Sequence, residues 1–266
     1  MYAFKYHKPS SLDEALALAG QLTDGKILAG GQSLVQAMKL RLASPTDIVD
    51  LGGVKDLAGI KVDGSSITIG AMTRHADVEN NADVKKMIPA LARLAGGIGD
   101  RQVRHMGTIG GSLANSDPAA CYPAAVLGLG ATITTNKRKI AADDFFKGLF
   151  ETALEPGELI TAVTFPSAKR AGYIKFKNPA SRFALVGVFV AETSSGIRVA
   201  VTGAASCVFR VAAIEKALAA NFSPDAVPAD TVKADTLNGD LHGSAEYRAH
   251  LITVMARRAV TQALGK

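Results

Sequence analysis

The chain has 266 residues, of which 48% are apolar and 20% charged, and it carries a formal net charge of +6. This length and composition are those of an ordinary globular protein with a large buried core and two or three lobes. The basic residues form no dense run, so we expect no nucleic-acid partner. No apolar run reaches the ~20 residues that span a bilayer, and residues 1–11 contain no apolar signal segment. We therefore expect a cytoplasmic location and no integral membrane segment.

Cys121 and Cys207 are the only two cysteines, and they lie far apart in the sequence. Two cysteines cannot assemble an iron–sulfur cluster with four thiolate ligands or a cysteine-rich zinc site. A disulfide between them is disfavoured in the cytoplasm. We also find no Ser/His/Asp set and no His/Glu spacing typical of a metal site, so we expect neither catalytic residues nor a metal site in this chain.

The first predicted elements form a small α/β lobe over residues 1–57. Ser11 and Glu14 have the spacing of a capping box, which favours a helix from Leu12 onward. A strand over 26–29, a helix over 34–42 and a strand over 47–51 follow. The first of these strands leads into Ala29-Gly30-Gly31-Gln32-Ser33-Leu34, and a strand, glycine turn and helix in this order are typical of an anion-binding site.

A second lobe over residues 58–167 begins with a hairpin whose turn is Asp63-Gly64. Its predicted elements are strands over 60–62 and 66–69, helices over 73–80, 84–94 and 123–129, and strands over 131–135 and 159–165. A third lobe covers residues 168–266. Its predicted elements are strands over 173–177, 185–192 and 197–201, helices over 210–221 and 245–264, and a surface loop over 223–235. This mixture of strands and helices favours an α+β fold.

A second glycine motif, Thr108-Ile109-Gly110-Gly111-Ser112-Leu113-Ala114-Asn115, lies in the middle of the chain. Because adjacent glycines can take φ > 0 and let a ligand approach the backbone, we expect a turn there, with Gly111 at positive φ. Consecutive backbone N–H groups in such a turn bind anions without a basic side chain. Two such motifs, far apart in the sequence, predict one diphosphate held from two sides. Neither motif is a P-loop or a G-x-G-x-x-G fingerprint.

The pair of motifs resembles the FAD-binding (medium) subunit of the molybdenum hydroxylases, the family that includes carbon monoxide dehydrogenase and xanthine dehydrogenase. In that family a first A-G-G-x-S loop and a second T-I-G-G-N/S loop hold the FAD diphosphate, and both occur here in the same order. The resemblance extends from Phe4 to the C-terminal helix. It implies an α+β fold with an FAD-binding domain of two α/β lobes, of the PCMH type, followed by a C-terminal domain of a sheet and helices.

The resemblance also implies which residues contact a non-covalently bound FAD. The diphosphate would lie between two sets of mostly backbone groups: Ala29, Gly30, Gly31, Gln32, Ser33 and Leu34 on one side, and Thr108, Ile109, Gly110, Gly111, Ser112 and Asn115 on the other. Ile98 matches a position near the adenine, with plain core packing as the alternative. Covalent attachment of the flavin to His75 or His105 is disfavoured, because the family binds FAD without it.

Further positions match residues around the ribityl chain and the flavin ring. Asp117 is placed to accept from ribityl hydroxyls, with a simple Asp117-Pro118 turn as the alternative. Many relatives have an acid where this chain has Cys121, a poor hydrogen-bond acceptor. Ile160 matches an apolar position that packs on the isoalloxazine. Lys177 matches a lysine beside the ring, where a cation stabilises reduced flavin, with a solvated strand lysine as the alternative.

The function that the resemblance implies is electron transfer within a complex. A large subunit would oxidise the substrate at molybdopterin, and a small subunit with two iron–sulfur (2Fe–2S) clusters would relay the electrons. The FAD of this chain would deliver them to an external acceptor such as NAD, a quinone or oxygen. One alternative is a stand-alone FAD-dependent oxidoreductase of the same superfamily, for which we find no acid/base residues. The other is an assembly module without flavin, against which the intact glycine motifs argue.

Overall fold

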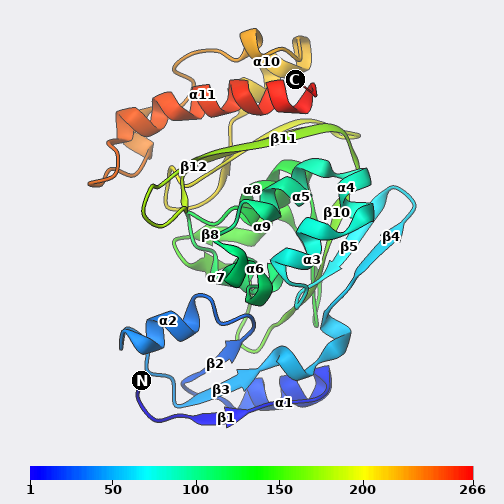
Figure 1. Cartoon of the computed structure of the whole chain (residues 1–266), viewed down its shortest axis with the longest axis vertical. Helices are drawn as coiled ribbons and strands as arrows, with labels where there is room; N and C mark the ends of the chain where they lie inside the picture. Colours follow the sequence, from blue (N-terminus) through cyan, green and yellow to red (C-terminus); the bar gives the residue numbers. More distant parts are fainter. Residues whose placement is uncertain (266) are drawn as a thin grey trace.

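The computed structural model describes residues 1–265, and its N-terminal part is a three-stranded parallel sheet (Figure 1). The elements are β1 (Lys5–His7), α1 (Leu12–Gln21), β2 (Gly25–Leu28), α2 (Leu34–Lys39) and β3 (Asp47–Asp50), with strand order β1-β3-β2. The Ser11 hydroxyl accepts from the N–H of Glu14, as the capping box predicts, but the Glu14 carboxylate accepts from the N–H of Ser10 and not from that of Ser11. Ala15 and Val49 are fully buried in a core that belongs mainly to this lobe.

The middle of the chain forms a five-stranded antiparallel sheet with short helices packed against it. Its elements are η1 (Leu51–Gly53), η2 (Lys55–Leu57), β4 (Ile60–Asp63), β5 (Ser66–Gly70), α3 (His75–Asn80), α4 (Ala82–Met87), α5 (Pro89–Gly96), α6 (Arg101–Met106), α7 (Ile109–Asn115), α8 (Tyr122–Leu129), β6 (Thr132–Thr135), β7 (Lys139–Ala141), α9 (Ala142–Phe145), β8 (Phe146–Gly148), β9 (Glu151–Thr152) and β10 (Ile160–Pro166). The sheet order is β4-β5-β10-β6-β7, and β8 pairs with β9 separately. The predicted β4–β5 hairpin is confirmed, with Ile60 opposite Ile69.

Two predictions about the helices of this region are wrong. The single helix expected over 84–94 is divided, because proline cannot donate a backbone hydrogen bond and disfavours a helical conformation in the residue before it. Ile88, which precedes Pro89, is accordingly outside the helical region, with φ −138° and ψ 68°. The second glycine motif, expected to form a turn, lies in the helix α7, and α6 directly precedes it.

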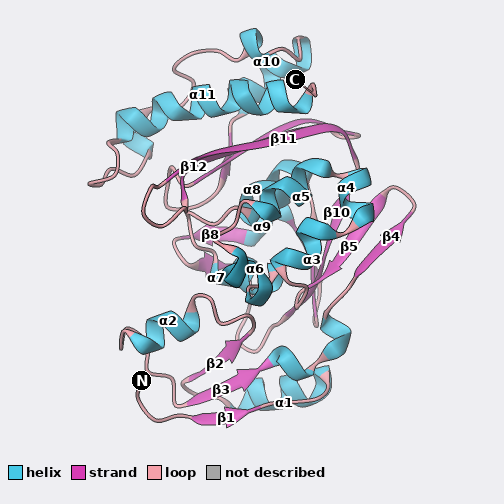
Figure 2. Ribbon diagram, viewed as in Figure 1, coloured by secondary structure: helices cyan, strands magenta, loops and turns pink. Residues whose placement is uncertain are grey.

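The C-terminal part is a four-stranded antiparallel sheet with two helices on its outer face (Figure 2). Its elements are β11 (Ala168–Lys177), β12 (Ala184–Thr193), β13 (Gly196–Thr202), β14 (Phe209–Arg210), α10 (Ala212–Ala220), η3 (Pro224–Ala226), η4 (Ala234–Thr236) and α11 (Ala245–Ala263). Helix α11 lies directly on β11, because a Cβ atom at Gly172 would be only 2.1 Å from the carbonyl oxygen of Ala259. No helix within residues 1–265 has the length and apolar character needed to cross a membrane.

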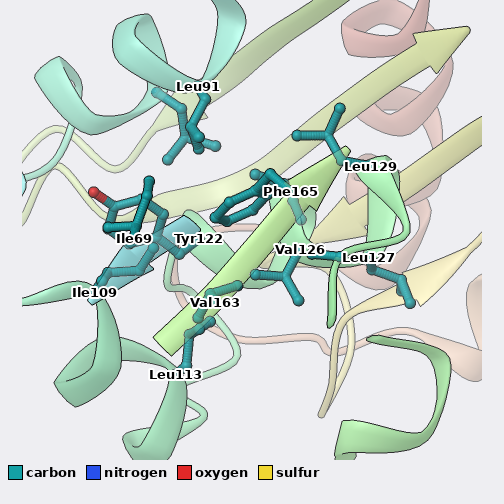
Figure 3. Close-up of a cluster of buried hydrophobic side chains, with 14 of the residues drawn as sticks. Ile69, Leu91, Ile109, Leu113, Tyr122, Val126, Leu127, Leu129, Val163 and Phe165 are labelled. Carbon is teal, nitrogen blue, oxygen red and sulfur yellow. The ribbon is translucent and has the colours of Figure 1, made fainter. Parts of the chain in front are cut away.

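The main core lies between the two larger sheets, around helices α5 and α8 (Figure 3). Tyr122 and Phe165, both fully buried, come from the middle of the chain, whereas Phe189 comes from the C-terminal sheet and belongs to the same cluster. A second core fills the space between that sheet and α10 and α11. The α+β class is thereby confirmed. The domain boundaries at 57/58 and 167/168 stay a prediction, because the main core continues across residue 167.

Candidate functional site

The first glycine motif forms a tight turn between β2 and α2. Gly31 has a φ of +74°, and Ser33 is already in the right-handed helical region. Within residues 1–265, the backbone N–H groups of residues 30–34 donate no hydrogen bond to a protein acceptor. The side chains of Gln32 and Ser33 are exposed beside them. Consecutive free N–H groups around a left-handed residue form a concave anion site, and we call residues 30–34 the cradle.

The second glycine motif is the first turn of a helix and not an open turn. Thr108 is the N-cap of α7, and its hydroxyl accepts from the N–H of Gly111 at 3.2 Å. Neither Gly110 nor Gly111 is among the glycines with positive φ. The expectation of positive φ at Gly111 is therefore wrong, because the Thr108 cap continues the helical backbone through both glycines.

The backbone donors at the start of α7 are already used within the protein. The N–H of Ile109 donates to the carbonyl of Thr73, and that of Gly110 to the carbonyl of Ala71. Together with the bond from Gly111 to Thr108, these contacts satisfy three consecutive N–H groups. The expectation that both motifs offer backbone donors is thus met only in the cradle. Membership of Ile109, Gly110 and Gly111 in the cofactor site stays a prediction.

The glycines of the two motifs serve close packing between them. A Cβ atom at Gly30 would lie 2.2 Å from the carbonyl oxygen of Met106, which is impossible without movement. A Cβ at Gly111 would lie 3.2 Å from the Cβ of Ala29. Residues 29–30 therefore touch the segment that leads into α7. The structure brings the two motifs together, as the sequence predicts.

Helix α7 presents polar side chains without protein partners on one face. Ser112 and Asn115 are three positions apart, so they lie on the same side of the helix, near Gly111. Both side chains are partly buried, and neither makes a hydrogen bond within residues 1–265. Thr108 is buried, and its hydroxyl retains a free proton while it accepts from Gly111. These groups can donate to a ligand between α7 and the cradle.

The segment that follows α7 is fixed by its own turn. Ser116 ends the helix in the left-handed conformation, with φ 44° and ψ 43°. One oxygen of Asp117 accepts from the N–H of Ala119 at 2.8 Å, so this side chain forms the turn that the alternative interpretation predicted. Its second oxygen makes no hydrogen bond within the described chain, and a role toward a ligand stays a prediction.

A lysine that the sequence analysis missed lies beside Cys121. The Nζ of Lys175 is 3.2 Å from the Cys121 sulfur, and the Tyr173 hydroxyl lies close to the same sulfur without a hydrogen bond of normal geometry. Burial, and then the neighbouring Cys121, raise the pKa of Tyr173 well above its usual value. Lys177, the predicted residue, is exposed at the end of β11. Regular strand alternation would place both lysines on one face, but the pairing of β11 with β12 is irregular between Phe176 and Lys177.

Two apolar positions predicted near the cofactor are packed against the main core. Ile160 is 5% exposed and belongs to that core, at a bulge where β10 pairs with β6. Ile98 is partly buried against the same core, and its carbonyl accepts from Arg104. Core packing alone accounts for the apolar residue at both positions, so contact with a cofactor stays a prediction for each.

His75 lies directly beneath the second motif but is not available to a ligand. Its backbone N–H donates to the carbonyl of Gly107, and its ring packs on that of Tyr122 with 5.3 Å between the ring centroids. Burial, with a smaller effect of Arg104, lowers the pKa of His75 to about 4. The ring is therefore neutral at physiological pH. Within residues 1–265, no group of three or more His, Cys, Asp or Glu side chains is placed to hold a metal ion.

Comparison with known proteins identifies the family of this chain. Residues 2–168 match the family described as the FAD binding domain in molybdopterin dehydrogenase. The nicotine 6-hydroxylase medium subunit of Paenarthrobacter nicotinovorans is 36% identical over 98% of this chain and 97% of its own. The carbon monoxide dehydrogenase medium chain of Afipia carboxidovorans is 35% identical over 98% of this chain and 96% of its own.

Solved structures agree with the sequence comparison. A chain of carbon monoxide dehydrogenase from Hydrogenophaga pseudoflava has a TM-score of 0.90 and 37% identity, covering 99% of this chain and 98% of its own. Fold, cradle and relatives define an FAD-binding oxidoreductase subunit. The chain belongs to the medium, FAD-binding subunits of the molybdenum hydroxylase family.

Proposed function

We propose that this chain holds FAD non-covalently between the cradle and α7 and passes electrons from a 2Fe–2S subunit to an external acceptor. The observation that carries the proposal is the run of free N–H groups at residues 30–34, set against a helix with free polar side chains. A diphosphate supplies the acceptor oxygens that these donors lack. FAD, when bound, accepts an electron pair and can release electrons singly.

Each part of the site has a separate role in this proposal. The cradle, with Ala29 beside it, binds the diphosphate, and Thr108 and Ser112 donate hydroxyl bonds from the other side. Gly110 and Gly111 keep α7 close to the ligand. Asn115 and Asp117 face the ribityl hydroxyls. Around the rings we place Ile98, Ile160, Lys177 and Lys175, and the ammonium of Lys175 stabilises negative charge on reduced flavin.

The relatives' names support a role within a larger complex. A "medium" subunit or chain implies companions of other sizes, and the two separated cysteines of this chain cannot ligate an iron–sulfur cluster. We therefore assign the clusters to a small partner subunit and the molybdopterin to a large one. The acceptor lies outside these three chains, as a soluble carrier or a quinone.

The mode of binding is tested by denaturing the purified chain with acid or heat. Free FAD is expected in the supernatant, because the cradle uses hydrogen bonds and no covalent link. Flavin that remains on the precipitated protein would contradict this expectation, and so would FMN in place of FAD.

The role in the complex is tested by co-expression with the 2Fe–2S and molybdopterin subunits of the same operon. We expect a stable complex in which substrate bleaches the flavin, whereas the chain alone reduces dyes slowly at most. Turnover of an organic substrate by the chain alone would favour the stand-alone flavoenzyme. A colourless chain that still joins the complex would favour the assembly module.

A further inference from the structure

The segment between α7 and α8 is held by the C-terminal sheet, which lies outside the matched family region of residues 2–168. Three consecutive carbonyls of this segment accept from that sheet or from the residue directly after β13. Pro118 accepts from the N–H of Gly203 at 2.7 Å, and Ala119 from the N–H of Ala184 at 3.4 Å. Ala120 accepts from the hydroxyl of Thr202 at 2.7 Å. The conformation of residues 117–121 is therefore set from outside the domain that contains them.

The side-chain contacts with the segment come from one row of residues across three strands. Lys175 of β11 lies opposite Gly187 of β12, and Gly187 lies opposite Thr202 of β13. Residues opposite each other in a sheet share a face, so all three face the segment. Lys175 reaches Cys121 at one end of the row, and Thr202 reaches Pro118 and Ala120 at the other.

Gly187 leaves the space that this row requires. A Cβ atom there would lie 2.9 Å from the Thr202 methyl group and 2.7 Å from the Tyr173 hydroxyl. Any side chain at position 187 would therefore displace Thr202 or Tyr173. The absence of a side chain in the middle of the row lets the residues on either side reach the segment.

Thr202 is the member of the row that contacts two carbonyls of the segment. It is 0% exposed, and its single hydroxyl proton is shared between the carbonyls of Pro118 at 2.8 Å and Ala120 at 2.7 Å. Both carbonyls lie within three residues of Asp117. A buried carbonyl that loses its donor is costly, so this hydroxyl favours one conformation of the segment over others.

We infer that Thr202 is a positioning residue of the FAD site, acting through residues 117–121 and without touching the cofactor. The inference rests on the proposed site. When the segment is already held in its bound conformation, FAD binding requires no further ordering of it. A more mobile segment would lose conformational entropy on binding, which weakens the affinity. The C-terminal domain thus contributes to FAD affinity through its inner sheet face.

The test compares Thr202→Val, Thr202→Ser and Thr193→Val with the full-length wild type. Valine keeps the shape of threonine but removes the hydroxyl, and serine keeps the hydroxyl. Thr193 is the matched control, because it is also buried and bonded through its hydroxyl, at the opposite end of the same sheet. FAD affinity of the apoprotein is measured by flavin fluorescence, and the free energy of unfolding by urea denaturation without FAD.

We expect Thr202→Val to bind FAD about tenfold more weakly, the equivalent of one neutral hydrogen bond. Thr202→Ser should restore most of the affinity, and Thr193→Val should keep it at a similar cost in stability. Gly187→Ala, which displaces Thr202 without removing its hydroxyl, should weaken FAD binding in the same way if Thr202→Val folds poorly. Wild-type affinity in both Thr202→Val and Gly187→Ala would overturn the inference, as would an equal loss in Thr193→Val. A wild-type chain that binds no FAD overturns the proposed function itself.

Discussion

Lys175 and Lys177 are two lysines only two positions apart on β11, yet their surroundings differ. Lys175 is partly buried and contacts Cys121, whereas Lys177 is exposed. Within residues 1–265, Lys175 makes no ion pair with a carboxylate. Its positive charge is therefore available to a bound ligand, and the pair offers a direct comparison.

We expect Lys175→Met to lower the midpoint potential of the bound flavin more than Lys177→Met does. An ammonium beside the ring stabilises the reduced anionic form, and a loss of about 1.4 kcal/mol corresponds to ~30 mV for a two-electron couple. Spectroelectrochemical titration of both variants measures the difference. An unchanged potential in Lys175→Met, with a shift only in Lys177→Met, would return the role to the residue predicted from the sequence.

His75 gives the chain a specific acid sensitivity. Its pKa falls from 6.5 in the unfolded chain to about 4 in the folded protein, so the unfolded state binds more protons between these values. Stability is therefore full above pH 6.5 and decreases as the pH falls toward 4. We expect a loss of about 2 kcal/mol between pH 7 and pH 5 from this group alone.

Urea denaturation of the wild type and His75→Gln across this range measures the effect. The variant should lose less stability between pH 7 and pH 5. Glu158 acts in a separate window, because its hydrogen bond with Arg138 lowers its pKa to about 2, so its contribution is lost only below pH 4.5. Identical pH profiles in the two proteins would exclude His75 as the cause.

At the scale of an element, the two glycines of α7 differ in the space around them. A Cβ at Gly110 would lie 2.5 Å from the Cβ of Ala71 and 2.7 Å from its carbonyl oxygen, so the backbone of α7 would have to move. A Cβ at Gly111 would meet the Thr108 hydroxyl at 3.0 Å and the Ala29 side chain at 3.2 Å. A side chain at position 110 would therefore collide with the backbone before α3, whereas one at position 111 would enter the space between the two glycine motifs.

Gly110→Ala is expected to lose about 2–3 kcal/mol of stability through overpacking. Gly111→Ala should stay within about 1 kcal/mol of the wild type, since alanine favours a helix, but should bind FAD more weakly because its methyl group lies between the two motifs. Urea denaturation and FAD titration separate the two effects. A Gly111→Ala chain that binds FAD as the wild type does would show that this position does not face the ligand.

The second motif also shows how far the sequence could predict the site. The paired glycines identified the segment, because glycine lets another part of the chain or a ligand approach the backbone closely. In the structure, Gly111 lies against Ala29, and Gly30 lies against the residues that lead into α7. Its conformation was predicted wrongly, because glycine disfavours helices and a doublet is normally read as a turn. The Thr108 cap overrides that preference through one side-chain bond. Lys175 was missed because its importance depends on Cys121, which is 54 positions away in the sequence.

At the scale of the whole molecule, one arginine joins the C-terminal sheet to the middle of the chain. Arg198 of β13 donates to the carbonyl of Leu127 in α8 at 2.8 Å and to both carboxylate oxygens of Asp143. Its side chain is mostly buried, whereas Lys169, which pairs with Glu192, is mostly exposed. Buried and exposed charges of this kind contribute very differently to stability.

Arg198→Met is therefore expected to cost about 2 kcal/mol of unfolding free energy, because it removes two hydrogen bonds to the Asp143 carboxylate and one to the Leu127 carbonyl, which keeps only the N–H of Gly130 as a donor at 3.3 Å. Lys169→Met, the matched control, should cost less than about 1 kcal/mol. Urea denaturation without FAD measures both. Equal losses would mean that the Arg198 contact between the C-terminal sheet and the middle of the chain contributes no more to stability than a surface ion pair.

The overall architecture followed from the resemblance more than from local patterns. Helical and strand periodicity predicted β12, β13 and α11, whose buried residues are mainly apolar, but not the short α6 and α7. The shared core was outside the reach of sequence patterns, because Phe189 and Tyr122 meet only in the folded chain. Divisions of the chain drawn from sequence at residue 167 cut through that core.

The separation between the lobe that carries the cradle and the body that carries α7 bears on how quickly FAD exchanges. The small N-terminal lobe has mainly its own core, and its glycine turn meets the rest of the site across a close backbone contact at Gly30 and Met106. We expect a ligand held between the two to leave more readily when they move apart. The residence time of FAD would then be governed by that opening motion, and a flavin held for hours would not require a high density of contacts.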